Sequence, residues 1–153
     1  MKSIFDYKKK YEEAEFNNKR NYLKFQIINQ WMRLRNRGVG LGEFFSDRKI
    51  KTISIYGLGE LGELIYEEMT KQADVNVLFA IDRNRIEADN LMVFSLDDIP
   101  NAPDAVVISP VLNIDEIEDK IYEKLGEIPT YTLEEIIYEL SRKHGVSSLL
   151  WEI

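Results

Sequence analysis

The hydrophobic positions of the chain follow two different patterns, which meet near residue 50. Up to about Arg37 the apolar residues recur at helical spacing: Leu23, Ile27, Ile28, Trp31, Met32 and Leu34. Asn17 and Asn18 leave open whether this segment is one helix or two. Gly38 is suited to end it. We expect Trp31 to anchor the helix on the rest of the protein; the alternative is that it lies on a surface for a partner.

From Lys51 onward, short apolar runs alternate with helical patterns. The expected strands are residues 52–56, 75–81, 91–94, 105–109 and 128–131. A helix is expected after the glycine turn, with Leu61, Leu64, Ile65 and Met69 on one face. Others are expected over 114–125 and from 132 to Gly145, where Thr132 and Glu135 form a capping box; Ser95 opens a short capped turn. This alternation predicts a parallel sheet with right-handed crossovers and strand order 3-2-1-4-5. The expected fold is α/β, a Rossmann-like three-layer sandwich with an N-terminal helical extension.

Charge is divided unevenly along the chain. Residues 1–50 hold 12 Lys/Arg and 6 Asp/Glu, a net charge of +6, whereas residues 51–153 hold 8 and 21, a net charge of −13. We therefore expect a helical extension over 1–50, a nucleotide-binding domain over 51–145 and a tail over 146–153. Nucleic acid is an unfavourable partner for so acidic a domain, because phosphate contacts dominate that affinity.

The composition limits which chemical sites and which cellular compartment we expect. The chain has no cysteine, which excludes disulfides, thiolate metal sites and cysteine nucleophiles. No apolar run approaches the roughly 20 residues that a membrane-spanning helix needs, and the polar N-terminus is unlike a signal peptide. We expect a cytoplasmic protein that is not an integral membrane protein.

The strongest motif is the glycine turn Gly57-Leu58-Gly59-Glu60-Leu61-Gly62, between an expected strand and an expected helix. Gly57 would allow the tight turn, Gly59 would let the backbone approach a phosphate, and Gly62 would let helix and strand pack closely. Asp82 lies 20 residues beyond Gly62, where a carboxylate can hold a ribose hydroxyl. The candidate nucleotide-binding residues are Gly57, Leu58, Gly59, Glu60, Leu61, Gly62, Asp82, Arg83 and Ser109.

Several charges complicate this hypothesis. Glu60 and Glu63 suit the positive end of a helix dipole, but they would repel a pyrophosphate there. Arg83 and Arg85 could offset that repulsion or contact a phosphate. In the alternative interpretation the glycines serve the turn alone and Asp82 makes only local bonds. Ser109 at the carboxyl edge of the sheet could bind a ligand or cap its own turn.

No catalytic group stands out. No Tyr-x-x-x-Lys pair and no Gly-x-Ser-x-Gly motif occurs. The single histidine, His144, falls in the last turn of the last expected helix, where the helix dipole favours it. No His, Asp and Glu cluster has metal-ligand spacing, so we predict neither catalytic nor metal-binding residues.

Three segments together resemble a known bacterial family: residues 53–62, 80–84 and 132–136. The family consists of small Rossmann-like domains found with cell-surface polysaccharide genes, alone or fused to glycosyltransferases. They are similar to the N-terminal domain of sugar-nucleotide acyltransferases, which contributes to sugar-nucleotide binding. The resemblance implies that Gly57, Gly59, Gly62 and Asp82 line a nucleotide pocket. The acyltransferase's β-helix with its catalytic histidine is absent, so the resemblance does not imply acyl transfer.

Three functional hypotheses follow. The first is a non-catalytic module that binds a nucleotide, NAD(P) or a nucleotide sugar and serves surface-polysaccharide synthesis with a protein partner. The second is an interaction or scaffold protein that kept the fold without the ligand. The third is an NAD(P)-dependent enzyme completed by a partner or a dimer. A homodimer is compatible with the exposed strand edges and the N-terminal helix.

Overall fold

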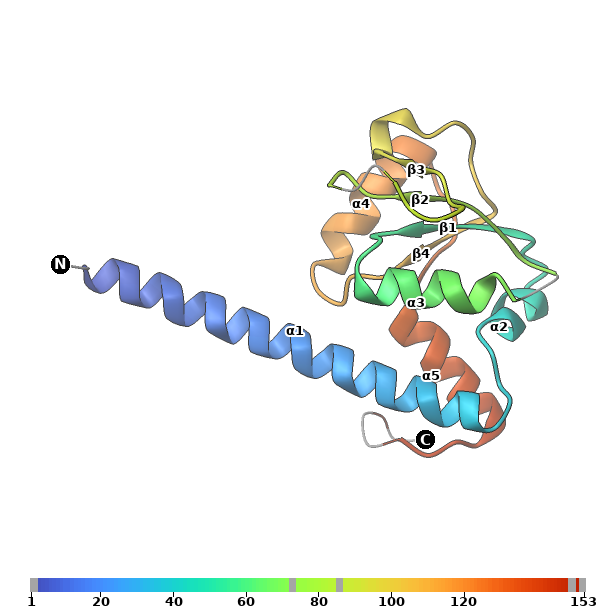
Figure 1. Ribbon diagram of the computed structural model, residues 1–153, viewed down its shortest axis with the longest axis horizontal. Coiled ribbons are helices and arrows are strands. Elements are labelled where there is room, and N and C mark those ends of the chain that lie inside the picture. The colour runs from blue at the N-terminus through green and yellow to red at the C-terminus, as the bar shows by residue number, and fades with distance from the viewer. Residues whose placement is uncertain (1–2, 72–73, 85–86, 149–150, 152–153) are drawn as a thin grey trace.

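The computed structural model describes residues 3–71, 74–84, 87–148 and 151 of the chain. Its helices are α1 (Ile4–Asn36), α2 (Gly42–Asp47), α3 (Glu60–Met69), α4 (Ile114–Leu125) and α5 (Leu133–His144), with one 3-10 turn, η1 (Leu96–Asp98). Its strands are β1 (Thr52–Tyr56), β2 (Asn76–Ile81), β3 (Val93–Phe94), β4 (Ala105–Ile108) and β5 (Thr130–Thr132). Helix α1 extends far beyond the α/β domain, which lies around its C-terminal half (Figure 1).

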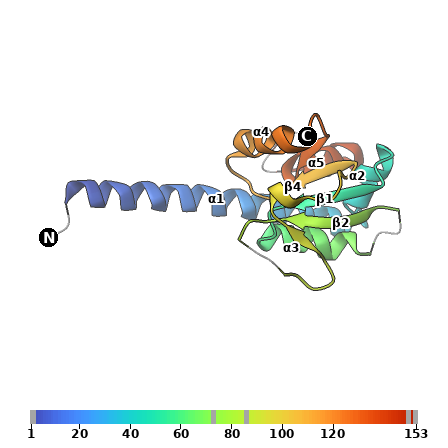
Figure 2. The same ribbon diagram turned by 90° about the horizontal axis from the view of Figure 1, so that it is seen from above.

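The five strands form one all-parallel sheet in the order β3-β2-β1-β4-β5, which confirms the predicted fold and strand order. The central strand β1 ends at Tyr56, which is in register with Ile81 of β2 and Ile108 of β4. Helix α3 connects β1 to β2 on one side of the central strand, and α4 connects β4 to β5 on the other side. Because right-handed crossovers in opposite directions lie on opposite faces of a sheet, α3 and α4 cover different faces (Figure 2). The carboxyl edge between β1 and β4 is therefore a topological switch point, where such sheets bind ligands.

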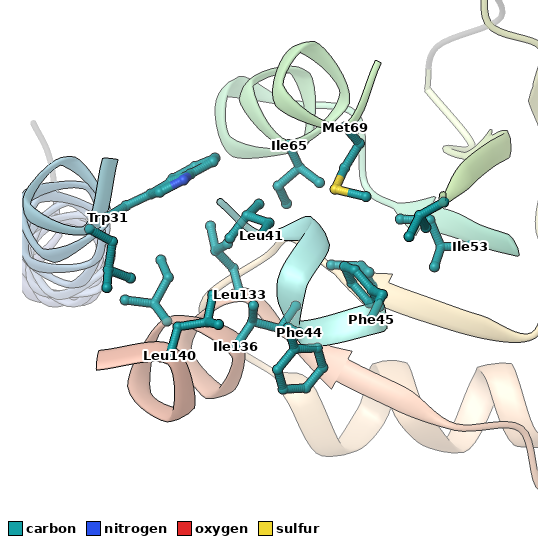
Figure 3. Packing of buried hydrophobic residues seen from close by; sticks show 14 of the residues in the cluster. Trp31, Leu41, Phe44, Phe45, Ile53, Ile65, Met69, Leu133, Ile136 and Leu140 are labelled. Atoms are coloured by element: carbon teal, nitrogen blue, oxygen red, sulfur yellow. The ribbon is translucent and has the colours of Figure 1, made fainter. Parts of the chain in front are cut away.

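The larger core lies on the sheet face covered by α3 and α5 (Figure 3). Ile53 from β1 and Ile65 from α3 meet Phe44 and Phe45 of the short helix α2 there, all at most 2% exposed. Trp31 of α1 belongs to the same cluster and its ring points toward α3, which confirms the predicted anchor. The N-terminal helices are thus built into the core of the domain. A smaller cluster under α4 covers the other face.

The structure corrects some expectations about the elements. Helix α1 runs through Asn17 and Asn18 without interruption, because an asparagine in an exposed helix costs less than about 0.7 kcal/mol and a break would forfeit backbone hydrogen bonds. Met32 is 57% exposed and does not join the buried stripe. The third strand is only Val93–Phe94, and the fifth is shifted to Thr130–Thr132.

The cap at the start of α5 forms as predicted. The Thr132 hydroxyl accepts a hydrogen bond from the Glu135 backbone N–H at 3.0 Å, and the Glu135 carboxylate accepts one from the Thr132 N–H at 2.8 Å. Gly145 ends the helix with a φ of 64°. At η1 the Ser95 hydroxyl instead donates to the Asp98 carboxylate and makes no bond to the backbone of that turn.

Candidate functional site

The glycine turn lies at the carboxyl end of β1, at the switch point of the sheet. Gly57 has a φ of +86°, a conformation that other residues rarely adopt, and its N–H donates to the Ile81 carbonyl at 2.8 Å. Gly62 faces the same turn, since a Cβ atom there would lie 2.1 Å from the Gly57 carbonyl oxygen. Both glycines therefore do in the structure what the sequence predicted: one makes the turn and the other permits close packing.

Gly59 has a different environment. It is the N-cap of α3, with ordinary extended backbone angles, and a Cβ atom added to it would meet nothing within 4 Å. Its carbonyl accepts the hydrogen bond from the Glu63 N–H at 2.9 Å that begins the helix. The backbone at Gly59 is thus open on one side, next to a helix N-terminus whose first N–H groups and dipole favour an anion.

Asp82 follows β2 and ties two loops together through its carboxylate. Oδ2 accepts a hydrogen bond from the Leu58 backbone N–H and Oδ1 accepts one from the Asn84 N–H, both at 2.9 Å. The side chain is half-buried. Each carboxylate oxygen has about two acceptor positions, so these local bonds leave room for a ligand hydroxyl. The structure therefore places Asp82 directly against the glycine turn.

Ser109 follows β4 and is 6% exposed. Its hydroxyl lies 2.6 Å from the Gly57 carbonyl oxygen and 3.1 Å from that of Tyr56. Because a hydroxyl has a single proton to donate, these two carbonyls occupy it. Ser109 thus holds the glycine turn from the β4 side, as Asp82 holds it from the β2 side.

Two clefts flank the turn and share Gly57, Asp82 and Asn84. The first, here the α4 cleft, has a volume of about 580 Å³ and is lined by Tyr56, Gly57, Ile81, Asp82, Arg83, Asn84, Ser95, Leu96, Asp97, Lys120, Glu123 and Lys124. The second, here the α1 cleft, has a volume of about 510 Å³ and is lined by Phe16, Arg20, Lys24, Gly57, Gly59, Glu60, Leu61, Asp82, Asn84 and residues 109–113. A ligand at the turn therefore has space on both sides of it.

The α1 cleft contains two cations that the sequence analysis missed. Arg20 and Lys24 lie one turn apart on α1 and line the cleft opposite Gly59 and Glu60. Arg20 Nε is buried and has no hydrogen-bond partner among the residues that the structure describes. The signal was present in their spacing, because Arg20, Lys24 and the core residue Ile27 fall on one side of the helix. Without the packing of α1, however, nothing placed that side over the glycine turn.

The other charges are distributed between the clefts. Glu60 is exposed at the rim of the α1 cleft, and Arg83 is exposed at the α4 cleft. On the far wall of the α4 cleft, Lys124 forms an ion pair of 2.7 Å with Asp97, and the hydrogen bond to this carboxylate raises the pKa of Lys124. Arg85, the other cation considered from the sequence, lies outside the described residues.

The single histidine lies away from these clefts, and the described part of the chain shows neither a metal-binding cluster nor a membrane-spanning helix. His144 lies 2.5 Å from the Glu43 carboxylate, at the end of α5. Within residues 3–71, 74–84 and 87–148, no group of three or more His, Cys, Asp or Glu is arranged to hold a metal ion. No helix in the described residues is long and apolar enough to cross a membrane.

Comparison with known proteins adds no assignment. A scan against models of known protein families and a search of curated proteins both found no match for this chain.

Proposed function

We propose that this chain is a module that binds a nucleotide or a nucleotide sugar, with the ligand's phosphates at the Gly57–Gly62 turn. One observation carries the proposal: the open backbone at Gly59 lies in the same cleft as Arg20, whose buried Nε has no partner among the described residues. The oxygens of one phosphate would accept hydrogen bonds from the backbone at Gly59 and from Arg20 Nε. Burying an unpaired cationic donor is otherwise unfavourable.

The residues present fit the parts of such a ligand. The phosphates would be held by the backbone at Gly59 and the start of α3, together with Arg20 and Lys24. The ribose hydroxyls would bind the remaining acceptor positions of Asp82, next to Arg83 in the α4 cleft. NAD(P) and a nucleotide sugar share this diphosphate and ribose chemistry. When bound, the former would supply a hydride carrier and the latter a glycosyl group.

The electrostatic objection from Glu60 is weakened by the position of α1. Glu60 is exposed and screened by solvent, whereas Arg20 and Lys24 are both partly buried. In a partly desolvated cleft, the two cations act on a phosphate more strongly than the exposed carboxylates Glu60 and Glu63 repel it.

The biological setting rests on the resemblance of the glycine turn and its neighbours to polysaccharide-associated domains. We propose that the chain acts in the cytoplasm of a bacterium, in surface-polysaccharide synthesis, together with a glycan-synthesis protein as its partner.

The test is a thermal-shift screen of the purified chain with NAD, NADP, coenzyme A and UDP-, GDP- and CMP-sugars. A ligand at about 100 times its dissociation constant should stabilise the native state by about 2.7 kcal/mol. Gly59→Glu should abolish the shift while leaving the helix content unchanged, because a side chain at this position meets open space. Gly59→Ala is the matched control and should keep most of the affinity. A panel without any shift at millimolar ligand would refute nucleotide binding.

A second candidate function is an interaction or scaffold protein that kept the fold without the ligand. The local bonds of Asp82 to Leu58 and Asn84, and of Ser109 to Gly57, favour it, because they give these polar groups a purely structural task. A flat ligand panel together with an unchanged, stable fold in Gly59→Glu would support this alternative.

A further inference from the structure

The N-terminal half of α1 extends away from the domain in two perpendicular views (Figures 1 and 2). The helix nevertheless exposes large apolar side chains along its length, each between 57% and 88% exposed: Ile4, Tyr7, Tyr11, Tyr22, Phe25 and Met32. A single solvated helix of this kind is marginally stable in water, because most helical stability in proteins comes from packing an apolar face. The exposed residues therefore indicate a surface that is buried in the functional state.

Five of these six residues, all but Tyr22, follow the spacing of a coiled coil. Positions alternate by three and four residues over the length of the helix: Ile4, Tyr7, Tyr11, Ala14, Asn18, Asn21, Phe25, Ile28 and Met32. We name this set the α1 stripe; in heptad notation its members occupy a and d. At about 100° per residue, most of the stripe lies opposite to Ile27 and Leu34, through which α1 packs on its own domain; Ile28, near its C-terminal end, is partly buried against that core. The face with Ile27 and Leu34 thus packs on the domain, while Ile4, Tyr7, Tyr11 and Phe25 of the stripe are left exposed.

We propose that two copies of this chain associate through the α1 stripe as a parallel, in-register, two-stranded coiled coil. In this arrangement Asn18 occupies an a position opposite Asn18 of the second copy, and a buried asparagine at a favours two strands in fixed register. Lys10 at g faces Glu15 at e of the other copy, a pair of opposite charges.

The available area is in the range that a stable dimer needs. Tyr7, Tyr11 and Phe25 of the stripe, and Tyr22 at a flanking e position, each expose 61–64% of their area. With about 150–250 Å² per aromatic side chain, they offer on the order of 360–600 Å² per copy. Ile4 and Met32 bring the surface close to the roughly 800 Å² that each partner buries in a standard interface.

The charge of the projecting half favours a second copy over an anionic membrane. Residues 4–19 hold four Lys and four Asp/Glu, a net charge of zero. A helix that binds anionic lipid has an excess of Lys and Arg on its polar face. Asn18 and Asn21 within the stripe would also be unfavourable in a lipid environment, whereas across a helix pair they find polar partners.

Sedimentation equilibrium of the full chain tests the association. The wild type should show twice the mass of one chain at micromolar concentration. Tyr11→Glu places a charge within the stripe and should raise the dimer dissociation constant at least tenfold. Phe5→Glu is the matched control, because Phe5 is an exposed aromatic residue of the same helix that lies outside the stripe; it should leave the dimer intact. A monomeric wild type at 100 µM, or equal effects of the two variants, would overturn the proposal.

The orientation is tested by cross-linking, for which the absence of cysteine provides a clean background. In a parallel pair Ile4→Cys should form an intermolecular disulfide on mild oxidation, and Phe5→Cys should do so much less. A dimer without the Ile4→Cys disulfide would exclude the parallel form. Asn18→Leu should shift the mass toward higher oligomers; an unchanged mass would remove the role of Asn18. Binding of monomers to anionic phosphatidylserine vesicles would instead identify a membrane surface and refute the dimer.

Discussion

The indole of Trp31 donates a hydrogen bond to the Glu68 carboxylate at 2.9 Å, and both side chains are only 6% exposed. The same carboxylate accepts the Leu41 backbone N–H at 2.6 Å and pairs with the Arg35 guanidinium at 2.7 Å. One buried side chain of α3 thus holds α1 and the segment that leads into α2. This contact fixes the position of α1, and with it the position of the cations that line the α1 cleft.

Replacing Glu68 should destabilise the protein far more than replacing its neighbour. Glu68→Gln leaves an amide that can accept fewer of the three donors and brings N–H groups against them. We expect a loss of about 2–4 kcal/mol in the free energy of unfolding, because a buried charged network is broken. Urea denaturation measures the loss. Glu67→Gln, one position earlier on the exposed side, should change stability by less than about 0.5 kcal/mol. Equal effects of the two substitutions would contradict the role of Glu68.

In the glycine turn, we expect alanine substitutions at two glycines to have different effects on stability. Gly62→Ala puts a methyl group 2.1 Å from the Gly57 carbonyl oxygen, so the turn or α3 must move. We expect a net destabilisation of about 1–3 kcal/mol in spite of the better helix propensity of alanine. Gly59→Ala meets no atom within 4 Å and should leave the unfolding midpoint nearly unchanged. A neutral Gly62→Ala would show that the turn relaxes freely.

The fold was predictable because its signals are local. Hydrophobic runs marked the strands, the Thr132–Glu135 capping box marked the start of α5, and Gly57 and Gly62 marked the turn. The ends of individual helices and strands were harder to predict than the elements themselves. The sequence left open whether the helix is broken at Asn17 and Asn18, which α1 tolerates at its exposed surface, and the ends of β3 and β5 depend on pairing with neighbouring strands.

The candidate site was predictable in part. The sequence placed Asp82 and Ser109 near the turn, because parallel strands end at one edge. It could not show that their polar atoms bond to the turn itself, since that depends on side-chain rotamers. Nor could it place Arg20 and Lys24 there, because their position follows from how α1 packs, which long-range contacts such as Trp31–Glu68 decide.

The cations of the α1 cleft should determine affinity for the ligand that the thermal-shift screen identifies. We expect Arg20→Gln and Lys24→Gln each to weaken binding about tenfold, a loss of about 1.4 kcal/mol for one charged contact. Isothermal titration calorimetry measures this, and the wild type should lose affinity more steeply than the variants as salt is raised. Arg33→Gln is the control, because Arg33 is an exposed cation of α1 that bonds Asn29 and lines neither cleft. Unchanged affinity in both variants would exclude them from the site.

The end of α5 gives a pH-dependent prediction. Burial alone would raise the pKa of Glu43, but its hydrogen bonds and charge interactions with His144 and Lys143 outweigh burial and lower it below 4.5. A carboxyl whose pKa is lowered by folding stabilises the native state above its unfolded pKa, and this contribution is lost as the pH falls through the folded value. Glu43→Gln should therefore be less stable than the wild type by about 0.5 kcal/mol at pH 7, a modest figure because the pair is a third exposed.

The difference between Glu43→Gln and the wild type should shrink as the pH falls below the unfolded pKa and vanish once the pH is below the lowered pKa of folded Glu43, where the wild-type carboxyl is protonated too. Urea denaturation at a series of pH values and low salt follows this change. Glu127→Gln removes an exposed carboxylate and should run parallel to the wild type over the same range. A constant gap between Glu43→Gln and the wild type from pH 7 to pH 3 would mean that packing of the side chain, and not its charge, stabilises this end of α5.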